Sequence, residues 1–223
     1  MTTTTPTRRA GRPSRPPLTE RQIAEAALAL IDEFGWPGCT MQRLALRLGV
    51  RAPSLYHYID GRREIIELVR ALVVEEIHDP AIFALPWDEA MRRFGYVYYR
   101  AFAEHPNTIQ PLSTTPIRDP ATLALYEAFL STLVRDGWDR QRAFEALLGI
   151  EHLALGFAFE WNAEDLMLDS SCAAEHGAPL LAEVTLERTD QAAIAESSFV
   201  SLLERLIETY RRELDEPAGS IAR

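Results

Sequence analysis

The chain has no lysine, only two cysteines and no long run of apolar residues among its 223 positions. A membrane-spanning helix needs about 20 consecutive, mostly apolar residues, and the polar start lacks the apolar segment of a signal peptide. We therefore expect a soluble, cytoplasmic protein with no membrane partner. Cys39 and Cys172 lie far apart in the sequence, which gives neither a disulfide framework nor paired metal-ligand spacing and predicts two buried or inert thiols.

Because lysine is absent, all 23 basic residues are arginines. We attribute this mainly to the codon usage of a GC-rich genome, although arginine also binds phosphate and guanine in a bidentate geometry that lysine lacks. The net charge of −10 argues by itself against nucleic acid, whose binding needs cations beside phosphates. Its distribution reverses this conclusion. Residues 1–70 carry 11 Arg and 7 acidic residues, net +4, and the other 153 residues carry 12 Arg and 26 acidic residues, net −14.

The first 17 residues are mostly Thr, Pro and Arg with almost no apolar side chain, so we expect a disordered basic arm. A helix of about 16 residues should follow, with Thr19 as N-cap and Gln22 as its capping-box partner. Gly35 provides the C-terminal stop. The apolar positions that recur at helical spacing are Ile23, Ala27, Leu30, Ile31 and Phe34.

Two short helices are expected next. Thr40 can cap the first, Gly49 then turns the chain, and Pro53 opens the second, within residues 51–59. Such a pair, packed against a longer first helix, has helix-turn-helix character, and the second short helix of that unit lies in the DNA major groove. The expected inward residues are Leu44, Ala45, Leu48, Leu55 and Ile59.

The rest of the chain shows helical spacing and no alternation of period two, so the expected fold is all-α. Three prolines should break residues 105–119, and residues 165–188 should form a loop. The expected helices span residues 62–78, 87–104, 120–136, 140–164 and 189–214.

The ordered residues around the helix-turn-helix resemble the DNA-binding domain of the tetracycline-repressor (TetR) family over about 50 residues. The matching elements are the turn at residues 35–40, Leu44-Ala45 with Leu48-Gly49-Val50, Pro53-Ser54-Leu55-Tyr56, and Arg62 at the start of the next helix. The resemblance implies a homodimer with one recognition helix per subunit in successive major grooves of a palindromic operator. Half-site centres would lie about 34–36 Å apart.

The resemblance also implies which residues meet DNA. Ala52 stands where tetracycline-binding members carry Gln, so a bidentate adenine contact is absent and a different operator sequence is expected. Arg62 holds the position of a lysine near phosphate. The implied DNA-binding residues are Thr40, Gln42, Arg43, Ala52, Pro53, Ser54, Tyr56, His57, Tyr58 and Arg62.

Some of these positions have a second interpretation. The Tyr56 ring can pack against the first helix and offer only its hydroxyl to a phosphate, and His57 can contact phosphate or water. Arg43 and Arg47 can simply be solvated, Arg47 the more readily. The arm contains Gly11-Arg12-Pro13, similar to the core of minor-groove AT-hooks, and is either a minor-groove contact or a solubilising tail.

Parts of the acidic remainder resemble the ligand-binding domain of the same family, including Glu104-His105-Pro106 and residues 149–156. Leu112 and Phe94 replace a magnesium-binding His and a drug-contacting Asn of tetracycline-binding members, so we expect no metal or cofactor and a small apolar or aromatic effector. For each aromatic residue the alternative is a place in the core. The expected ligand-binding residues are His78, Phe94, Tyr98, Phe102, Gln110, Leu112, Phe129, His152, Phe157 and Trp161.

The two helices at 140–164 and 189–214 have apolar faces broad enough to bury on two sides, and Gly149 and Gly156 permit close helix approach. A four-helix dimer interface is expected, as the resemblance implies, the alternative being packing within one chain. The expected domains are a disordered basic arm (1–17), a helix-turn-helix DNA-binding domain (18–61), a linker helix (62–79), a helical ligand-binding and dimerisation domain (80–216) and a tail (217–223).

The expected function is therefore a ligand-responsive transcriptional repressor, with coupling near His78 and Pro80. An activator or an architectural DNA-binding protein is the alternative, since the sign of regulation depends on operator position. No enzyme is expected, because the sequence has no phosphate-binding loop, nucleophile elbow or H-E-x-x-H motif. The nearest such group, Glu151-His152 with Glu160, lies on an apolar helix.

Overall fold

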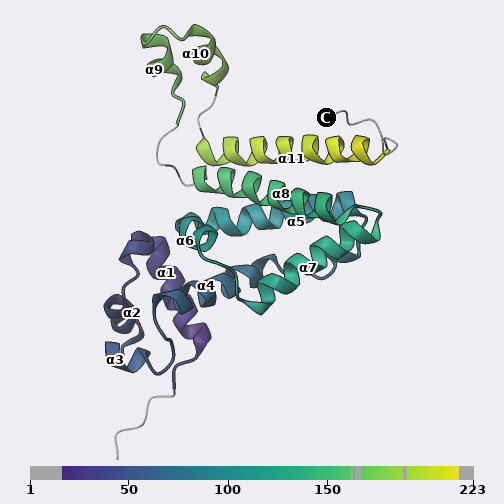
Figure 1. Ribbon diagram of the computed structural model, residues 1–223. Coiled ribbons are helices and arrows are strands. Elements are labelled where there is room, and N and C mark those ends of the chain that lie inside the picture. Colours follow the sequence, from purple (N-terminus) through teal and green to yellow (C-terminus); the bar gives the residue numbers. More distant parts are fainter. Residues whose placement is uncertain (1–16, 162, 164–166, 188–189, 216–223) are drawn as a thin grey trace, which may run out of the picture.

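The computed structural model describes residues 17–161, 163, 167–187 and 190–215, and all regular secondary structure in these ranges is helical (Figure 1). The predicted all-α class is confirmed. The predicted tail and, apart from Pro17, the predicted arm lie outside the described residues. The elements are α1 (Glu20–Gly38), α2 (Met41–Leu48), α3 (Ala52–Leu55), α4 (Arg62–Ile77), η1 (Ile82–Ala84), α5 (Trp87–Glu104), η2 (Pro106–Thr108), α6 (Ile109–Thr114), α7 (Pro120–Arg135), α8 (Arg140–Glu160), α9 (Ser170–Glu175), α10 (Pro179–Thr185) and α11 (Gln191–Asp215).

We call α1 to α3 the head and the elements from η1 onward the body; α4 connects them. The capping box of α1 forms as predicted, since Thr19 Oγ1 accepts from the Gln22 backbone N–H (3.2 Å) and Gln22 Oε1 accepts from that of Thr19 (3.0 Å). Gly35 breaks α1 with φ +67° and ψ 170°, a backbone conformation that is essentially restricted to glycine. One further turn extends α1 to Gly38, beyond the predicted stop.

The helix-turn-helix also forms as the sequence predicts. Thr40 Oγ1 accepts from the Arg43 backbone N–H (3.2 Å), and Gly49 ends α2 in the left-handed region (φ +67°, ψ 32°). Helix α3 is shorter than expected, because i to i+3 hydrogen bonds after Leu55 tighten the backbone into a turn. That turn brings Ile59 back into the core. Leu44, Ala45, Leu55 and Ile59 are buried, and Leu48 is partly buried.

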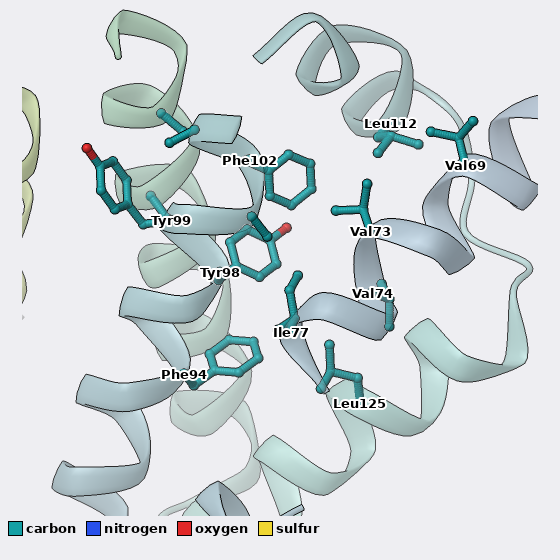
Figure 2. Close-up of a cluster of buried hydrophobic side chains, with 14 of the residues drawn as sticks. Val69, Val73, Val74, Ile77, Phe94, Tyr98, Tyr99, Phe102, Leu112 and Leu125 are labelled. Carbon is teal, nitrogen blue, oxygen red and sulfur yellow. The ribbon is translucent and has the colours of Figure 1, made fainter. Parts of the chain in front are cut away.

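Helix α5 runs through the body and packs against α4, α7, α8 and α11. In Figure 1, α8 and α11 lie side by side along one edge of the body. Figure 2 shows Tyr98 and Phe102 of α5 facing Val73 of α4 across the core, with Tyr99 on the other side of α5. There the Tyr99 ring stacks on Phe199 of α11 at 4.4 Å between centroids. The core is thus continuous from α4 to α11.

The prediction that residues 165–188 form a loop is wrong, because α9 and α10 lie within this range. Asp169 Oδ1 accepts from the Cys172 backbone N–H (2.8 Å) and caps α9, and Pro179 opens α10. Helices of six and seven residues hold too few turns for an apolar periodicity to reveal them. The two helices pack on each other and stand apart from the body (Figure 1).

Other expectations also need correction. Of the two thiols predicted to be buried or inert, Cys39 is buried and Cys172 is exposed on α9, so burial holds for Cys39 alone. Helix α8 ends at Glu160, four residues before the expected end at 164, and the proline-rich stretch 105–119 contains the short helices η2 and α6. Within the described ranges, no helix combines the length and the hydropathy that a membrane crossing requires.

Candidate functional site

One surface of the head carries the predicted DNA-binding residues of α2, α3 and the following turn. Tyr56 is 57 % exposed and Tyr58 is 36 % exposed, and Gln42, Pro53 and His57 are also exposed. The exposure of the Tyr56 ring favours a role at the surface over packing against α1. Thr40, Ala52 and Ser54 are half-buried, and Ala52 packs against the head core.

Two arginines on this surface are held by aromatic rings of the turn after α1. The Arg43 guanidinium lies over the Phe34 ring at 4.6 Å, and its Nη1 donates to Gly38 O (3.3 Å). The Arg62 guanidinium lies over the Trp36 ring at 4.2 Å, and its Nη2 donates to Trp36 O (2.8 Å). Neither guanidinium has a carboxylate partner among the described residues. Both therefore keep an uncompensated positive charge in a fixed position, which suits a phosphate.

Arg47 differs, because it forms an ion pair with Glu33 of α1. Arg47 is exposed, in line with the second interpretation, and its paired charge contributes less to the cationic surface. Arg62 also opens α4, whose N-cap Gly61 makes no side-chain capping hydrogen bond. The first backbone N–H groups of a helix attract anions. The start of α4 thus adds helix-end N–H groups to the Arg62 guanidinium.

The body contains a solvent-open pocket of about 460 Å³, which we call the body pocket. Helices α4, α5, α7 and α8 and the segment 112–117 form its wall. Its lining combines aromatic rings with two nearly buried charged residues, Arg70 (6 % exposed) and Glu151 (8 % exposed). The lining residues are Arg70, Tyr98, Phe102, Leu112, Ser113, Thr114, Thr115, Pro116, Ile117, Tyr126, Leu148, Glu151, His152 and Leu155.

Glu151 lies among hydroxyl groups in this pocket. The Tyr126 hydroxyl donates to Glu151 Oε1, and the Tyr98 hydroxyl also interacts with both groups. Burial raises the pKa of the Glu151 carboxyl, and the two tyrosine hydrogen bonds oppose that rise. His152 Nδ1 donates to Leu148 O (2.6 Å), which leaves Nε2 of the neutral ring as an acceptor.

Residues 23–69 match the family described as bacterial regulatory proteins, tetR family. The chain belongs to the TetR family. The matched residues hold most of α1, all of α2 and α3, and the start of α4, so they include the predicted DNA-binding residues. The head of this TetR-family protein is accordingly a helix-turn-helix domain, and the protein is a DNA-binding transcription regulator.

Two relatives extend the similarity into the body. An HTH-type transcriptional regulator of Saccharopolyspora erythraea is 27 % identical over 166 residues, covering 73 % of this chain and 70 % of the relative. The tetracycline repressor protein class D of Escherichia coli is 25 % identical over 204 residues, covering 88 % of this chain and 91 % of the relative.

Solved structures share the fold of this TetR-family protein. A possible TetR-family regulator from Streptomyces coelicolor A3(2) has a TM-score of 0.73 at 21 % identity, covering 87 % of this chain and 99 % of that one. A TetR variant from Acinetobacter baumannii AYE in complex with minocycline has a TM-score of 0.66 at 21 % identity, with coverage of 88 % and 98 %. BioQ with its double-stranded DNA operator has a TM-score of 0.57 at 19 % identity, with coverage of 79 % and 99 %.

The body pocket of this TetR-family protein gathers four of the residues predicted to bind ligand: Tyr98, Phe102, Leu112 and His152. The other six lie elsewhere. Phe94 and Phe129 are fully buried and pack on each other at 4.5 Å, as expected of core residues. Phe157 and Trp161 pack against Phe199 and Tyr99, and His78 and Gln110 are exposed away from the lining.

Sequence reasoning missed the polar residues of this pocket. Arg70 is buried on α4, and its Nη2 donates to the carbonyls of Leu112 (3.1 Å) and Thr115 (2.9 Å). Glu67, one turn earlier, accepts from the backbone N–H groups of Arg118 and Asp119, each at 3.0 Å. The signal was present, since Arg70 adjoins the inward residues of an otherwise apolar helix face, but only the fold shows what it binds.

A second contact joins the head to the body at His105. Its Nδ1 lies 2.9 Å from Asp32 Oδ2 of α1, and its Nε2 lies 3.9 Å from Glu76 Oε1 of α4. The hydrogen bond with Asp32 raises the pKa of His105, and burial raises the pKa of Glu76. Asn107 adds a hydrogen bond from its Nδ2 to Asp32 O (3.0 Å). The sequence predicts only a helix that ends at residue 104, and His105 is the C-cap of that helix.

Proposed function

We propose that this protein is a homodimeric transcriptional repressor that binds a palindromic operator and leaves it when a small apolar or aromatic molecule occupies the body pocket. One observation carries the proposal: the pocket wall at 112–119 is hydrogen-bonded to α4, and the same helix begins at Arg62 on the head surface. A change in the wall therefore has a direct connection to the DNA-binding surface.

The related proteins support both halves of this proposal. BioQ has been solved with its DNA operator, and the TetR variant of Acinetobacter baumannii has been solved with minocycline. One relative is itself a tetracycline repressor. By analogy, the head of this chain binds an operator and the body binds a small-molecule effector.

At the operator, α3 and the turn after it enter the major groove while α2 lies against the backbone. Tyr56, His57 and Tyr58 are the exposed side chains that reach base edges or phosphates. Arg43 and Arg62 flank them and bind phosphate. Thr40, Gln42, Ala52, Pro53 and Ser54 complete the contact surface.

The dimer is proposed to form through α8 and α11. Apolar side chains are exposed on these helices: Phe144 is 44 %, Phe159 is 66 % and Leu202 is 41 % exposed. A Cβ added at Gly156 would meet no atom within 4 Å, so this glycine leaves room for a second helix to approach α8. Exposed apolar faces of this kind mark protein interfaces.

Release is proposed to proceed through α4. An effector that binds one arrangement of the 112–117 wall better than another shifts the population of the two. Because Arg70 and Glu67 fix α4 to that wall, α4 shifts with it, and so does its first residue, Arg62, on the head surface. The two heads of the dimer then no longer match the operator spacing.

Footprinting of the DNA that flanks the gene tests the operator. The expected result is protection of an inverted repeat with half-sites about one helical turn apart. Protection of a single half-site, or none, contradicts the proposal. A reporter downstream of that site separates repression from activation, since removal of the protein should raise expression if it represses.

Sedimentation of the chain at micromolar concentration tests the dimer. Gly156→Leu fills the open side of α8 and should raise the dimer dissociation constant at least about tenfold, equal to about 1.4 kcal/mol. Ala121→Leu adds bulk to an exposed position of α7 and serves as the matched control, with no expected change. A wild-type monomer, or equal effects of the two variants, contradicts the proposed interface.

A further inference from the structure

We propose that the effector class of the body pocket is an aromatic amine that is cationic at neutral pH, with its ammonium group bound by the Glu151 carboxylate. This inference rests on the proposed function of the pocket as an effector site and adds the chemistry of the ligand. Three features of the lining carry it: a buried acidic group, the neutralisation of the only arginine, and the aromatic rings around them.

Glu151 is the only acidic residue that lines the pocket, and 8 % of its surface is exposed. It lies on α8 and reaches the cavity beside Tyr126 and Tyr98, which supply hydroxyl hydrogen bonds but no charge. A carboxylate has about four lone-pair positions, so two phenol donors leave part of its acceptor capacity free. A buried charge is costly unless a partner of opposite sign compensates it.

Arg70 lines the same pocket, and its charge and one of its terminal nitrogens already have protein partners. Its Nη2 donates to the carbonyls of Leu112 and Thr115, and its Nε lies 3.7 Å from Glu67 Oε1. Glu67 does not line the pocket, and it neutralises the guanidinium from the far side. No ion pair joins Arg70 to Glu151. Since Glu67 and Arg70 offset each other, a Glu151 carboxylate is the charge of this group that a cationic ligand can compensate.

The remaining polar groups of the lining mostly accept hydrogen bonds. The Tyr126 hydroxyl proton points to Glu151, and the Nδ1 proton of His152 points to Leu148 O, so the neutral ring keeps Nε2 as an acceptor. The hydroxyl of Thr114 donates to Gln110 O (2.8 Å). An acceptor-rich lining fits a ligand that brings donors, and an ammonium group brings them together with the missing charge.

The aromatic rings of the lining favour the same ligand. Tyr98, Phe102 and Tyr126 surround the carboxylate, and the Tyr98 and Phe102 rings lie 4.9 Å apart. Ring faces attract cations and stack with flat apolar ligands. A fused-ring amine is small enough for a pocket of about 460 Å³ and meets both requirements.

A charge series of one ring system tests the assignment. The DNA-free, full-length protein is titrated by fluorescence at pH 7.5 with 9-aminoacridine, a cation at that pH, with neutral acridine, and with anionic acridine-9-carboxylate. The expected order of affinity is cation, neutral, anion, with the cation at least about tenfold tighter than the neutral compound. Equal or weaker binding of the cation, including no binding of any of the three, overturns the assignment. Preference for the anion would instead make Arg70 the anchor.

Substitutions in the body pocket test whether the charge preference arises at Glu151. Glu151→Gln keeps the shape of the side chain and should lower the affinity for 9-aminoacridine at least about tenfold, with acridine changed by less than about twofold. Glu127→Gln, on the exposed side of α7, is the matched control and should leave both unchanged. Leu155→Trp fills the pocket and should weaken binding of the cation and the neutral compound alike. If Leu155→Trp binds the cation as the wild type does, the compound binds elsewhere and the assignment fails.

The acridine titration distinguishes failure of this inference from failure of the proposed repressor function. Operator DNA is absent, so a protein that does not repress or does not release DNA can still show the charge preference. Conversely, the protein could be released from DNA by a neutral effector and show no charge preference in the acridine series. That result would support the proposed function and contradict this inference. If Glu151→Gln does not fold, the wild-type charge series and the Leu155→Trp variant still show whether the body pocket prefers the cation.

Discussion

His105 Nδ1 lies 2.9 Å from Asp32 Oδ2, so the residue that ends α5 in the body is hydrogen-bonded to α1 in the head. Glu76 of α4 approaches the other ring nitrogen, and the neighbouring Glu104 adds a further negative charge. The imidazole thus joins the head, the connecting helix and the body, and the surrounding carboxylates raise its pKa. The Arg70 contact is a separate link, between α4 and the pocket wall of the body.

The His105 contact predicts a pH-dependent stability. The Asp32 hydrogen bond raises the pKa of His105, so the folded state holds the proton more tightly than the unfolded state. That stabilisation is fully present below the ordinary histidine value of about 6.5 and is lost as the pH rises through the raised value. The raised pKa of Glu76 acts in the same direction at lower pH.

His105→Asn should therefore lower Tm by about 2–4 °C near pH 6, corresponding to about 1 kcal/mol for a partly exposed charged hydrogen bond. The difference from the wild type should shrink toward pH 9. His176→Asn, at the exposed residue that follows α9, is the control, and its Tm difference should not vary with pH. A His105→Asn difference that stays constant between pH 6 and pH 9 would contradict this account.

Arg43 and Arg62 should each contribute about one phosphate contact. Their guanidinium groups are fixed on aromatic rings and carry no ion pair among the described residues. Arg43→Ala or Arg62→Ala should reduce the slope of log K against log salt by about 1 on a random-sequence duplex. Arg140→Ala, at the exposed start of α8, should leave the slope unchanged. Equal slopes for all the variants would exclude these two arginines from the interface.

Gly38 should not tolerate a side chain. A Cβ at this position would lie 2.4 Å from Phe34 Cβ and 3.1 Å from Arg43 Nη1. Gly38→Ala should therefore displace the turn and the Arg43 guanidinium, lowering stability by about 1–3 kcal/mol and weakening DNA binding. Ala121→Ser, at an exposed position of α7 outside the proposed dimer interface, is the control and should change stability by less than about 0.5 kcal/mol. Thermal melts of both variants decide between steric strain and general helix effects.

Arg70 should be important for stability as well as for coupling. Arg70→Met removes the bonds to Leu112 O and Thr115 O and leaves Glu67 without its cation. Breaking a buried ion pair in this way costs about 3–5 kcal/mol. Arg118→Met, which changes only an exposed side chain next to the same wall, should cost less than about 0.5 kcal/mol. Chemical denaturation of both variants measures the difference, and similar midpoints would show that Arg70 is not a structural link.

The local structure of the head could be predicted because its signals are short-range. Thr19, Thr40 and Gly49 specify the ends of helices through hydrogen bonds and backbone conformation within four residues of themselves. The same is true of the Trp87–Glu104 helix, whose bounds match the apolar spacing. The short helices α9 and α10 escaped prediction because each contains fewer than two full apolar repeats.

The body pocket could be predicted only in part, because its residues meet through tertiary packing. Tyr98 and Phe102 share a helical face, so their common exposure to the pocket follows from spacing. Phe94 belongs to the same helix but packs on Phe129 in the core. The position of α7 determines which of these side chains lie in the core and which line the pocket, and the spacing of residues along α5 does not predict that position. The charged residues Arg70 and Glu151 were similarly unassigned, since the sequence does not show which main-chain groups or hydroxyls face them.

The link between α4 and the pocket wall uses only main-chain atoms of the wall. Arg70 binds two carbonyl oxygens and Glu67 binds two amide groups, so the side chains of residues 112–119 are not needed for it. Mutations that reshape the wall for a new effector therefore leave the transmission to the head in place. In evolutionary terms, ligand specificity can drift while the response is inherited unchanged.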